Sequence, residues 1–474
     1  MFCGSCLEDG FAMLSLTRKK KEINILEGKI LPNMVRYAIP IMLTNILQLL
    51  YNSADMYVIG NFCEDPNAQG AIGCTGSLIS LIIGLFIGLG AGVCVTLSHS
   101  IGSRDDDRIS KTIHTSVTVA VILGVMVSII GFFLAPEILK LMNTLPEHIK
   151  GASLYVRIYF LGAIPNIMYN FCAGIMRSRG DTVRPLIFSS VGGVVNVILN
   201  MLFVIVFKMN VEGVAIATVA SQTVSSILSI IYLINLKDAC RLDLRKLGID
   251  KSTLVKFLKI GIPAGVQGTL FSLSNVLLQS GYNSLGPLFV NANAAANQVD
   301  AYLYNILNSF YHVVLTFASQ NYGAKNTRRL KKVFMLGCVL AVGIGFTLGI
   351  LSFIFSDTLV GIFNSDPDIL EVAKYRLLYV GLPYCLCGLM EIGTAMLRSI
   401  GYSLFSTIIT FFGSCLFRIV WILSVFPLHR TVSMLYVVYP ISWSFTFAML
   451  TIAYVLCYRY NKKKLIAAGV HFHD

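Results

Sequence analysis

One acidic residue, Asp55, lies inside a stretch of otherwise largely apolar residues. Gln48 and Asn52 precede it at helical spacing, so the three side chains share one face of a helix. A carboxylate at the centre of a bilayer costs about 2.5–3.5 kcal/mol on insertion scales, so it must face a cavity, a partner or a bound ion. Pro40 lies upstream in the same stretch and lacks a backbone N–H, which predicts a hinge there.

A second polar set lies further along the chain. Asn196 and Asn200 are four residues apart and therefore share a helix face, and Thr218 follows in the next apolar stretch. One carboxylate, two amide oxygens and a hydroxyl would suit a small cation such as Na⁺, and a desolvated Asp55 could bind H⁺ instead. The alternative is that these amides and the hydroxyl only make hydrogen bonds between membrane helices. We expect no other metal and no cofactor.

The C-terminal half has two acidic residues of its own, Asp300 and Glu391, each inside an apolar stretch. They could bind a cationic substrate or a second ion. Alternatively, they could pair with Arg376 or Arg418, or lie nearer the rim of the membrane.

The composition predicts what must position these residues. Only 13% of the 474 residues are charged and 55% are hydrophobic, whereas soluble proteins carry about 25% charged residues. Because a helical crossing needs about 20 apolar residues, we predict an all-α polytopic membrane protein with twelve transmembrane helices. The predicted spans are residues 35–61, 70–97, 112–135, 153–176, 185–207, 213–235, 257–284, 289–318, 332–356, 374–397, 403–427 and 434–458.

The net charge of +13 does not indicate a nucleic-acid partner, because the basic residues lie in alternate short loops between the apolar stretches. Such loops face the cytoplasm in membrane proteins. The first basic cluster is Arg18–Lys21 and the last is Lys462–Lys464. We therefore expect both termini in the cytoplasm and the protein in the cell membrane, in contact with the lipid bilayer.

The chain also repeats itself at a separation of about 220 residues. The matching pairs are Pro40 with Pro263, Gly102 with Gly323, Arg177 with Arg398 and Gly180 with Gly401. A repeat of six spans has parallel topology, which predicts two lobes related by a pseudo-two-fold axis along the membrane normal. The predicted parts are a cytoplasmic segment (1–34), an N-lobe (35–235), a cytoplasmic linker (236–256), a C-lobe (257–458) and a cytoplasmic tail (459–474). Since each chain has a complete cleft, we expect a functional monomer.

Several stretches together resemble the multidrug and toxic compound extrusion (MATE) family of transporters. They include "IPIMLTNILQLLYNSADMYVIG", "GAGVCVTLSHSIGSRD", "AGIMRSRGDTVRP" and "TFASQNYGAKN". The resemblance implies export of organic, mostly cationic compounds in exchange for inward Na⁺ or H⁺. It also implies a cation site at Asp55, Asn196, Asn200 and Thr218, with Pro40 as a helix hinge. Asn200 departs from the family pattern, which has Asp there, so the site carries one negative charge fewer.

Other functions remain open on the sequence. A lipid-linked oligosaccharide flippase of the same superfamily would need a cationic cavity. That alternative stays open because the apolar stretches contain three arginines, Arg157, Arg376 and Arg418. A membrane-embedded enzyme would need a cluster of His, Asp or Ser residues, which the sequence does not suggest. The glycine-rich run at residues 83–95 has neither the strand context nor the Lys of a nucleotide loop, so it predicts close helix packing. We therefore predict a transporter that works by alternating access, and not an enzyme.

Overall fold

The computed structural model describes residues 22–63, 65, 67–142, 144–364 and 366–467, and within them the regular structure is entirely helical. The basic cluster Arg18–Lys21 and most of the predicted N-terminal segment lie outside the described residues. The longer helices are α2 (Ile30–Phe62), α3 (Ala68–Gly102), α4 (Asp106–Leu141), α5 (Pro146–Leu161), α6 (Ala163–Ser178), α7 (Val183–Asn200), α8 (Val211–Ile234), α9 (Lys251–Leu285), α10 (Pro287–Gly323), α11 (Thr327–Ile354), α13 (Pro367–Arg376), α14 (Tyr384–Ser399) and α17 (Val432–Ala467).

Each predicted span falls on helical residues, but four of the twelve are interrupted. The fourth span bends by 48° between α5 and α6. Three others contain a π-helical turn: η1 (Met201–Val206) after α7, η3 (Leu377–Gly381) between α13 and α14, and η4 (Phe411–Leu416) between α15 (Ser403–Thr410) and α16 (Phe417–Ser424). The remaining short elements are η2 (Leu244–Lys246) and α12 (Ser356–Gly361). Single π turns change the direction of the side chains around them and are frequent at functional sites.

Nine helices of the described chain are long and apolar enough to cross a membrane, or ten if the bent α5–α6 pair forms one span. α9 and α10 are not among them, although they have 35 and 37 residues. The reason is that both present polar side chains, including Asn275, Gln279, Asn297 and Asp300, to an internal cavity. Many of the other helices expose large apolar side chains, as Phe133 on α4 does with 70% of its surface accessible, which suits a lipid environment.

The predicted repeat recurs in the backbone. The turn after α3 contains Arg104 with φ 55°, and the turn after α10 contains Lys325 with φ 56°. The turns after α6 and α14 contain Gly180 and Gly401 with φ 88° and 92°. Each pair is separated by 221 residues. Because the left-handed conformation is uncommon for residues other than glycine, its recurrence at matching positions indicates that the two halves share one turn geometry.

The two halves meet where α3 packs against α9 and α10. A Cβ atom added to Gly88 would lie 2.2 Å from the backbone nitrogen of Gly265 on α9. One added to Gly102 would lie 2.1 Å from the carbonyl oxygen of Gln320, and one added to Gly323 would lie 2.4 Å from that of His99. These helices approach so closely because glycine has no side chain. The prediction that the glycine-rich run serves close helix packing is confirmed at Gly88 and Gly92, whereas a Cβ added to Gly84 would meet nothing within 4 Å.

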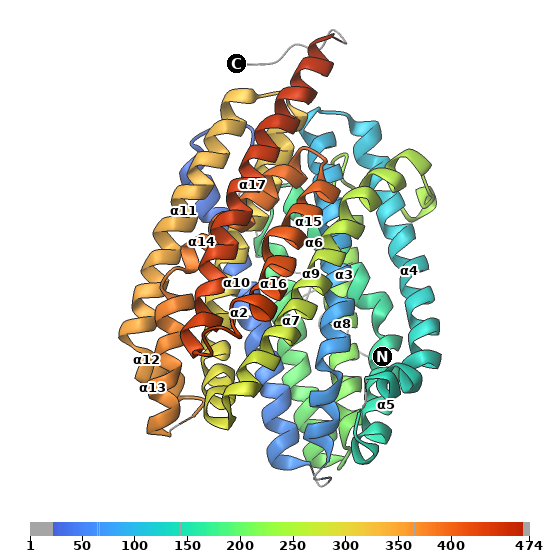
Figure 1. Cartoon of the computed structure of the whole chain (residues 1–474). Coiled ribbons are helices and arrows are strands. Elements are labelled where there is room, and N and C mark those ends of the chain that lie inside the picture. The colour runs from blue at the N-terminus through green and yellow to red at the C-terminus, as the bar shows by residue number, and fades with distance from the viewer. Residues whose placement is uncertain (1–21, 64, 66, 143, 365, 468–474) are drawn as a thin grey trace, which may run out of the picture.

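Two equivalent hydrogen bonds accompany this contact. His99 Nε2 on α3 donates to the carbonyl oxygen of Ser399 at the end of α14, over 2.6 Å. Gln320 Nε2 on α10 donates to the carbonyl oxygen of Ser178 at the end of α6, over 2.5 Å. Each half therefore bonds to the matching helix end of the other. This contact lies towards the end of the molecule where α2 begins and α17 ends (Figure 1).

Candidate functional site

A cavity lies within the N-terminal half, and we call it the N-terminal cavity. Its volume is about 420 Å³, and it is lined by side chains of α2, α3, α5, α6, α7 and α8. Five of the predicted site residues line it: Gln48, Asn52, Asp55, Asn196 and Thr218. Asp55 is the one Asp, Glu, Lys or Arg among the described residues of its lining. The predicted polar face of α2 therefore meets α7 and α8 around a hollow space.

Asp55 is bonded to the other predicted residues through Asn200. Asn200 is fully buried, and its Nδ2 atom donates to Asp55 Oδ1 and, over 3.3 Å, to Asn196 Oδ1. Asn196 Nδ2 donates to Thr218 Oγ1 over 3.5 Å. Since Asn196 and Asn200 are one helical turn apart on α7, both reach the same side. The four residues thus form one hydrogen-bonded chain from α2 through α7 to α8.

One buried acceptor in this chain of polar groups has no donor among the described residues. Asn200 Oδ1 is buried and meets no hydrogen-bond donor within the described part of the protein. A buried acceptor without a partner costs free energy unless something binds to it. Asp55 and Thr218, which line the cavity, carry oxygen atoms of the kind that a small cation prefers. The π turn η1 begins directly after Asn200.

Pro40 lies within α2, fifteen residues before Asp55, and is buried. The carbonyl oxygen of Pro40 accepts a hydrogen bond from Thr44 Oγ1 over 2.8 Å. Asn45, which sequence reasoning missed, joins this part of α2 to the other half: its Nδ2 atom donates to Asn305 O over 3.1 Å and to Ser309 Oγ over 3.3 Å. A bend of α2 at Pro40 would therefore also move a contact with α10.

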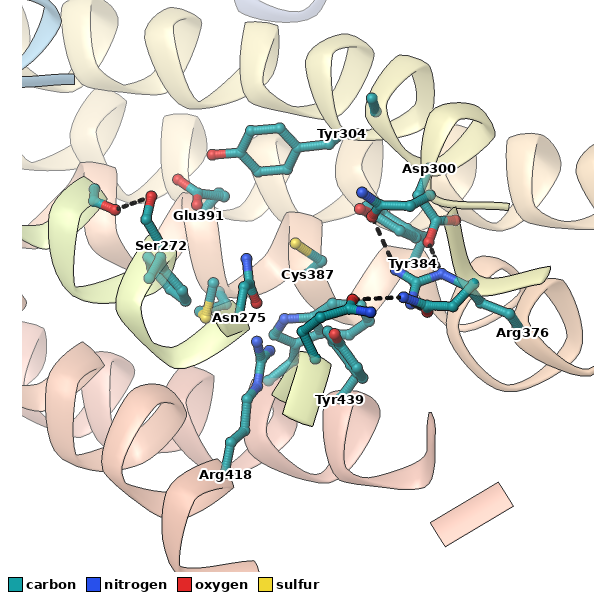
Figure 2. Close-up of a pocket in the computed structure, with 18 of the residues that line it drawn as sticks. Ser272, Asn275, Asp300, Tyr304, Arg376, Tyr384, Cys387, Glu391, Arg418 and Tyr439 are labelled. Carbon is teal, nitrogen blue, oxygen red and sulfur yellow. Dashed lines mark hydrogen bonds and ion pairs between the residues drawn. The ribbon is translucent and has the colours of Figure 1, made fainter. Parts of the chain in front are cut away.

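A second cavity, the C-terminal cavity, has a volume of about 390 Å³ and lies among α9, α10, α13, α14, α16 and α17 (Figure 2). Asp300 lines it but is paired with Arg376, whose Nε atom lies 2.7 Å from Asp300 Oδ2. Arg376 also donates to Asn293 Oδ1 over 2.5 Å and to Asn297 Oδ1 over 3.2 Å. Of the alternatives that the sequence left open for Asp300, the ion pair with Arg376 is the one present.

Glu391 has a different environment. It lines the C-terminal cavity near Tyr304 (Figure 2) and is 6% exposed. Within the described chain it makes neither an ion pair nor a hydrogen bond, so the pairing with Arg376 or Arg418 that the sequence allowed does not occur for Glu391. Its carboxylate is thus the one available to a ligand of this cavity.

The sequence contained a signal for the C-terminal cavity that we did not use. Asn293, Asn297 and Asp300 follow one another at the same spacing as Gln48, Asn52 and Asp55, and in each half the three residues line a cavity. The aromatic lining, which includes Tyr384 and Trp443, gives no comparable signal, since aromatic residues are common in every membrane helix.

Comparison with known proteins identifies the chain. The sequence model of the MatE family matches residues 40–202 and again residues 263–423. The chain belongs to the MatE family. The two matches begin at Pro40 and Pro263, which are the residues that the repeat had paired. The protein is accordingly a multi-pass membrane transporter of this family.

Two relatives show how far the similarity extends. The chain is 30% identical over 405 residues to the "Probable multidrug resistance protein YoeA" of Bacillus subtilis, covering 84% of this chain and 86% of that protein. It is 24% identical over 384 residues to the "Multidrug export protein MepA" of Staphylococcus saprophyticus, covering 81% and 84%.

Solved MATE structures have the same fold. One described as "MATE in the bent conformation" superposes with a TM-score of 0.86 at 22% identity, covering 94% of this chain and 99% of that one. Its counterpart "in the straight conformation" gives 0.85 at 21%, covering 94% and 100%. A transporter of the MOP superfamily from Pyrococcus furiosus, described by the "reverse polarity" of its binding pocket, gives 0.86 at 21%, covering 93% and 98%. The predicted all-α fold of twelve helices in two lobes is confirmed.

Proposed function

We propose that this MatE-family transporter is a secondary active antiporter that exports organic, mostly cationic drugs and toxic compounds in exchange for inward Na⁺ or H⁺. The names of the relatives support drugs as substrates, since they are a probable multidrug resistance protein and a multidrug export protein. We further propose that the protein acts as a monomer in the cell membrane, with both termini in the cytoplasm. Its N-lobe would comprise residues 35–235 and its C-lobe residues 257–458, joined by a cytoplasmic linker.

One observation carries the coupling proposal: Asp55 lines the N-terminal cavity bonded to an amide rather than to a basic residue. A carboxylate held by arginine would be neutralised permanently, whereas Asp55 can be neutralised by a transported cation. Asn196, Asn200 and Thr218 would contribute oxygen ligands, and Gln48 and Asn52 would keep the entry to the site polar.

The mechanism follows from the charge of Asp55. In the proposed cycle, binding of Na⁺ or H⁺ removes the cost of keeping a carboxylate in a low-dielectric environment, so α2 can bend at Pro40 and shrink the cavity. The bound drug is displaced outward, and the two lobes then rock to release the ion on the cytoplasmic side. Two solved structures of the same fold are described as a bent and a straight conformation, so proteins of this fold adopt more than one conformation.

In the C-terminal cavity we assign different roles to the two acids. Asp300 would neutralise Arg376, because the pair is buried and its geometry is close. Glu391 would attract the cationic part of a substrate or hold a second ion, because its carboxylate makes no ion pair and no hydrogen bond within the described residues, and the nearby Arg398 acts on it only through its charge.

A lipid-linked oligosaccharide flippase is the alternative that a specific observation favours. Arg418 lines the C-terminal cavity, and one structure of the same fold is described by a binding pocket of reversed polarity. Against it, Arg376 is already paired with Asp300, and the N-terminal cavity is lined by a carboxylate. A membrane-embedded enzyme is the weakest alternative, because the other members of the family compared above are named as transport or resistance proteins.

The test is transport by the purified protein in proteoliposomes. Ethidium movement is measured with a Na⁺ gradient and a pH gradient imposed separately. One gradient should drive transport, and Asp55→Asn should reduce it to the rate of protein-free vesicles. Asp357→Asn is the matched control, since Asp357 is exposed and pairs with Lys374 outside both cavities. Wild-type rates in Asp55→Asn under the effective gradient would remove Asp55 from the mechanism.

A further inference from the structure

Arg418 is a buried arginine whose Nη1 and Nη2 atoms donate to no acceptor in the described residues. The residue is 2% exposed, and its side chain reaches from α16 towards the C-terminal cavity (Figure 2). Nε donates to Ser442 Oγ over 3.1 Å. Nη2 is buried without an acceptor, and no acceptor in the described part of the chain meets Nη1. A guanidinium remains charged and presents a fork of donors that fits a carboxylate.

The neighbouring Arg376 shows what a satisfied arginine looks like in this cavity. Its Nε, Nη1 and Nη2 atoms donate to Asp300, Asn293 and Asn297, respectively. Arg376 is therefore committed to the protein itself. Within the described residues Arg418 makes one such bond, so its Nη1 and Nη2 atoms have no acceptor from that part of the protein.

Aromatic rings hold the Arg418 guanidinium in place. Its Cζ atom lies 4.3 Å from the ring centre of Tyr439 and 5.8 Å from that of Trp443. Cation–π contacts of this kind stabilise the charge without using the in-plane N–H groups. These contacts leave Nη1 and Nη2 without an acceptor in the described residues.

The charges that line the two cavities differ. The N-terminal cavity has Asp55 alone, which favours a cation. The C-terminal cavity has the Asp300–Arg376 ion pair, which is neutral as a unit, and then Glu391 and Arg418, which have opposite charges and do not pair with each other. Its remaining lining is largely aromatic and amide, and its volume lies within the usual range of small-molecule sites, about 300–1,000 Å³.

From this geometry we propose that Arg418 is a carboxylate-binding subsite, so that the C-terminal cavity takes zwitterionic organic compounds. The carboxylate of the ligand accepts hydrogen bonds from Nη1 and Nη2 of Arg418, and the cationic part lies towards Glu391. This proposal deepens the proposed export function and rests on it for the direction of transport. Binding itself can be tested without transport.

The experiment uses two dyes with one chromophore. Tetramethylrhodamine carries a free carboxylate beside its cationic ring system, and its methyl ester has the cation alone. Binding of each dye to the purified full-length protein is measured by fluorescence polarisation. We expect the free acid to bind about tenfold more tightly than the ester, as charge-assisted hydrogen bonds contribute. Equal affinities in the wild-type protein would overturn the proposal.

Variants locate the subsite. Arg418→Gln should abolish the preference for the free acid, while the ester should bind at least as tightly because a positive charge is removed from the cavity. Retained ester binding shows that the variant is folded. Arg418→Lys retains the charge without the fork and should retain part of the preference. Arg157→Gln is the control, because Arg157 lines neither cavity and donates to Phe132 O. A preference that survives in Arg418→Gln, or equal weakening of both dyes there, contradicts the subsite.

A further variant and a transport assay separate the subsite from the proposed function. Glu391→Gln should weaken both dyes equally, since both carry the cationic ring system. Preferential binding of the free acid without gradient-driven efflux of either dye would support the subsite and refute the antiporter. Gradient-driven efflux of both dyes together with equal binding affinities would support the antiporter and refute the subsite.

Discussion

Asn200 donates a hydrogen bond to Asp55 and so links α7 to α2 within the N-terminal cavity. The donor is an amide, whereas the resemblance to the MATE family implied a second carboxylate at this position. The pair therefore carries one negative charge when both residues are in their ordinary states, and one monovalent cation neutralises it completely. Under the proposed antiport, the single charge of this contact sets how many monovalent ions the site would bind.

The first prediction concerns that number. Asn200→Asp puts a second carboxylate against Asp55, and two like charges in contact each disfavour the ionised form of the other. In proteoliposomes, the transport rate should then depend more steeply on the coupling ion, with a Hill coefficient rising from about one towards two as the number of coupled sites increases.

The control for this change is Asn170→Asp. Asn170 lines the same cavity but its side chain is bonded to Asn166 rather than to Asp55. It adds the same charge to the cavity and should leave the steepness unchanged. An unaltered Hill coefficient in Asn200→Asp would show that Asn200 does not contribute to ion binding.

The second prediction concerns the bend in α2. Pro40→Ala restores a backbone donor in the helix interior, where proline costs about 3 kcal/mol or more. We expect a higher melting temperature in detergent and slower gradient-driven efflux, because the straight helix becomes harder to bend. Pro136→Ala in α4 is the control: Pro136 is also inside a helix, away from both cavities. It should stabilise the protein without slowing efflux, and equal slowing in both variants would contradict a hinge at Pro40.

The third prediction concerns the buried ion pair of the C-terminal cavity. Asp300→Asn leaves the Arg376 charge uncompensated, and breaking a buried pair in this way costs about 3–5 kcal/mol. The melting temperature, followed by tryptophan fluorescence, should fall clearly. The double variant Asp300→Asn/Arg376→Met removes both charges and should recover much of the loss. Failure of the second change to restore stability would mean that Asp300 acts through something other than Arg376.

The fourth prediction concerns the contact between the two halves. Gly102→Ala places a methyl group 2.1 Å from the carbonyl oxygen of Gln320, and overpacking of this kind costs about 1–3 kcal/mol. The melting temperature should fall. Gly84→Ala on the same helix is the control, since a Cβ there meets nothing within 4 Å. It should be neutral or slightly stabilising. Similar melting temperatures for the two variants would show that α3 and α10 can move apart at Gly102 at little cost in stability.

The sequence was sufficient for the helices, the repeat and the polar face of α2, because those depend on local periodicity and on matching turn residues. It was not sufficient for the pairing of Asp300 with Arg376. The two residues are 76 positions apart, and the sequence offered Arg418 as an equally suitable partner for Asp300. It also missed the π turns, since the extra residue in such a turn leaves no distinct pattern in an apolar run. Arg418 appeared only as a possible partner for an acid, and its unused donors became visible when its neighbours were placed.

The crossing of α3 and α10 has a consequence for how the molecule can open. His99 donates a hydrogen bond to Ser399 O and Gln320 donates one to Ser178 O, so each half is bonded to the other through the equivalent residue. A rotation that separates these helices must break both hydrogen bonds, together with the close contacts of Gly102 and Gly323 beside them. In the proposed alternating-access cycle, opening at this end breaks both hydrogen bonds together, so we expect a substitution on either side of the crossing to alter the rate of exchange between the two orientations.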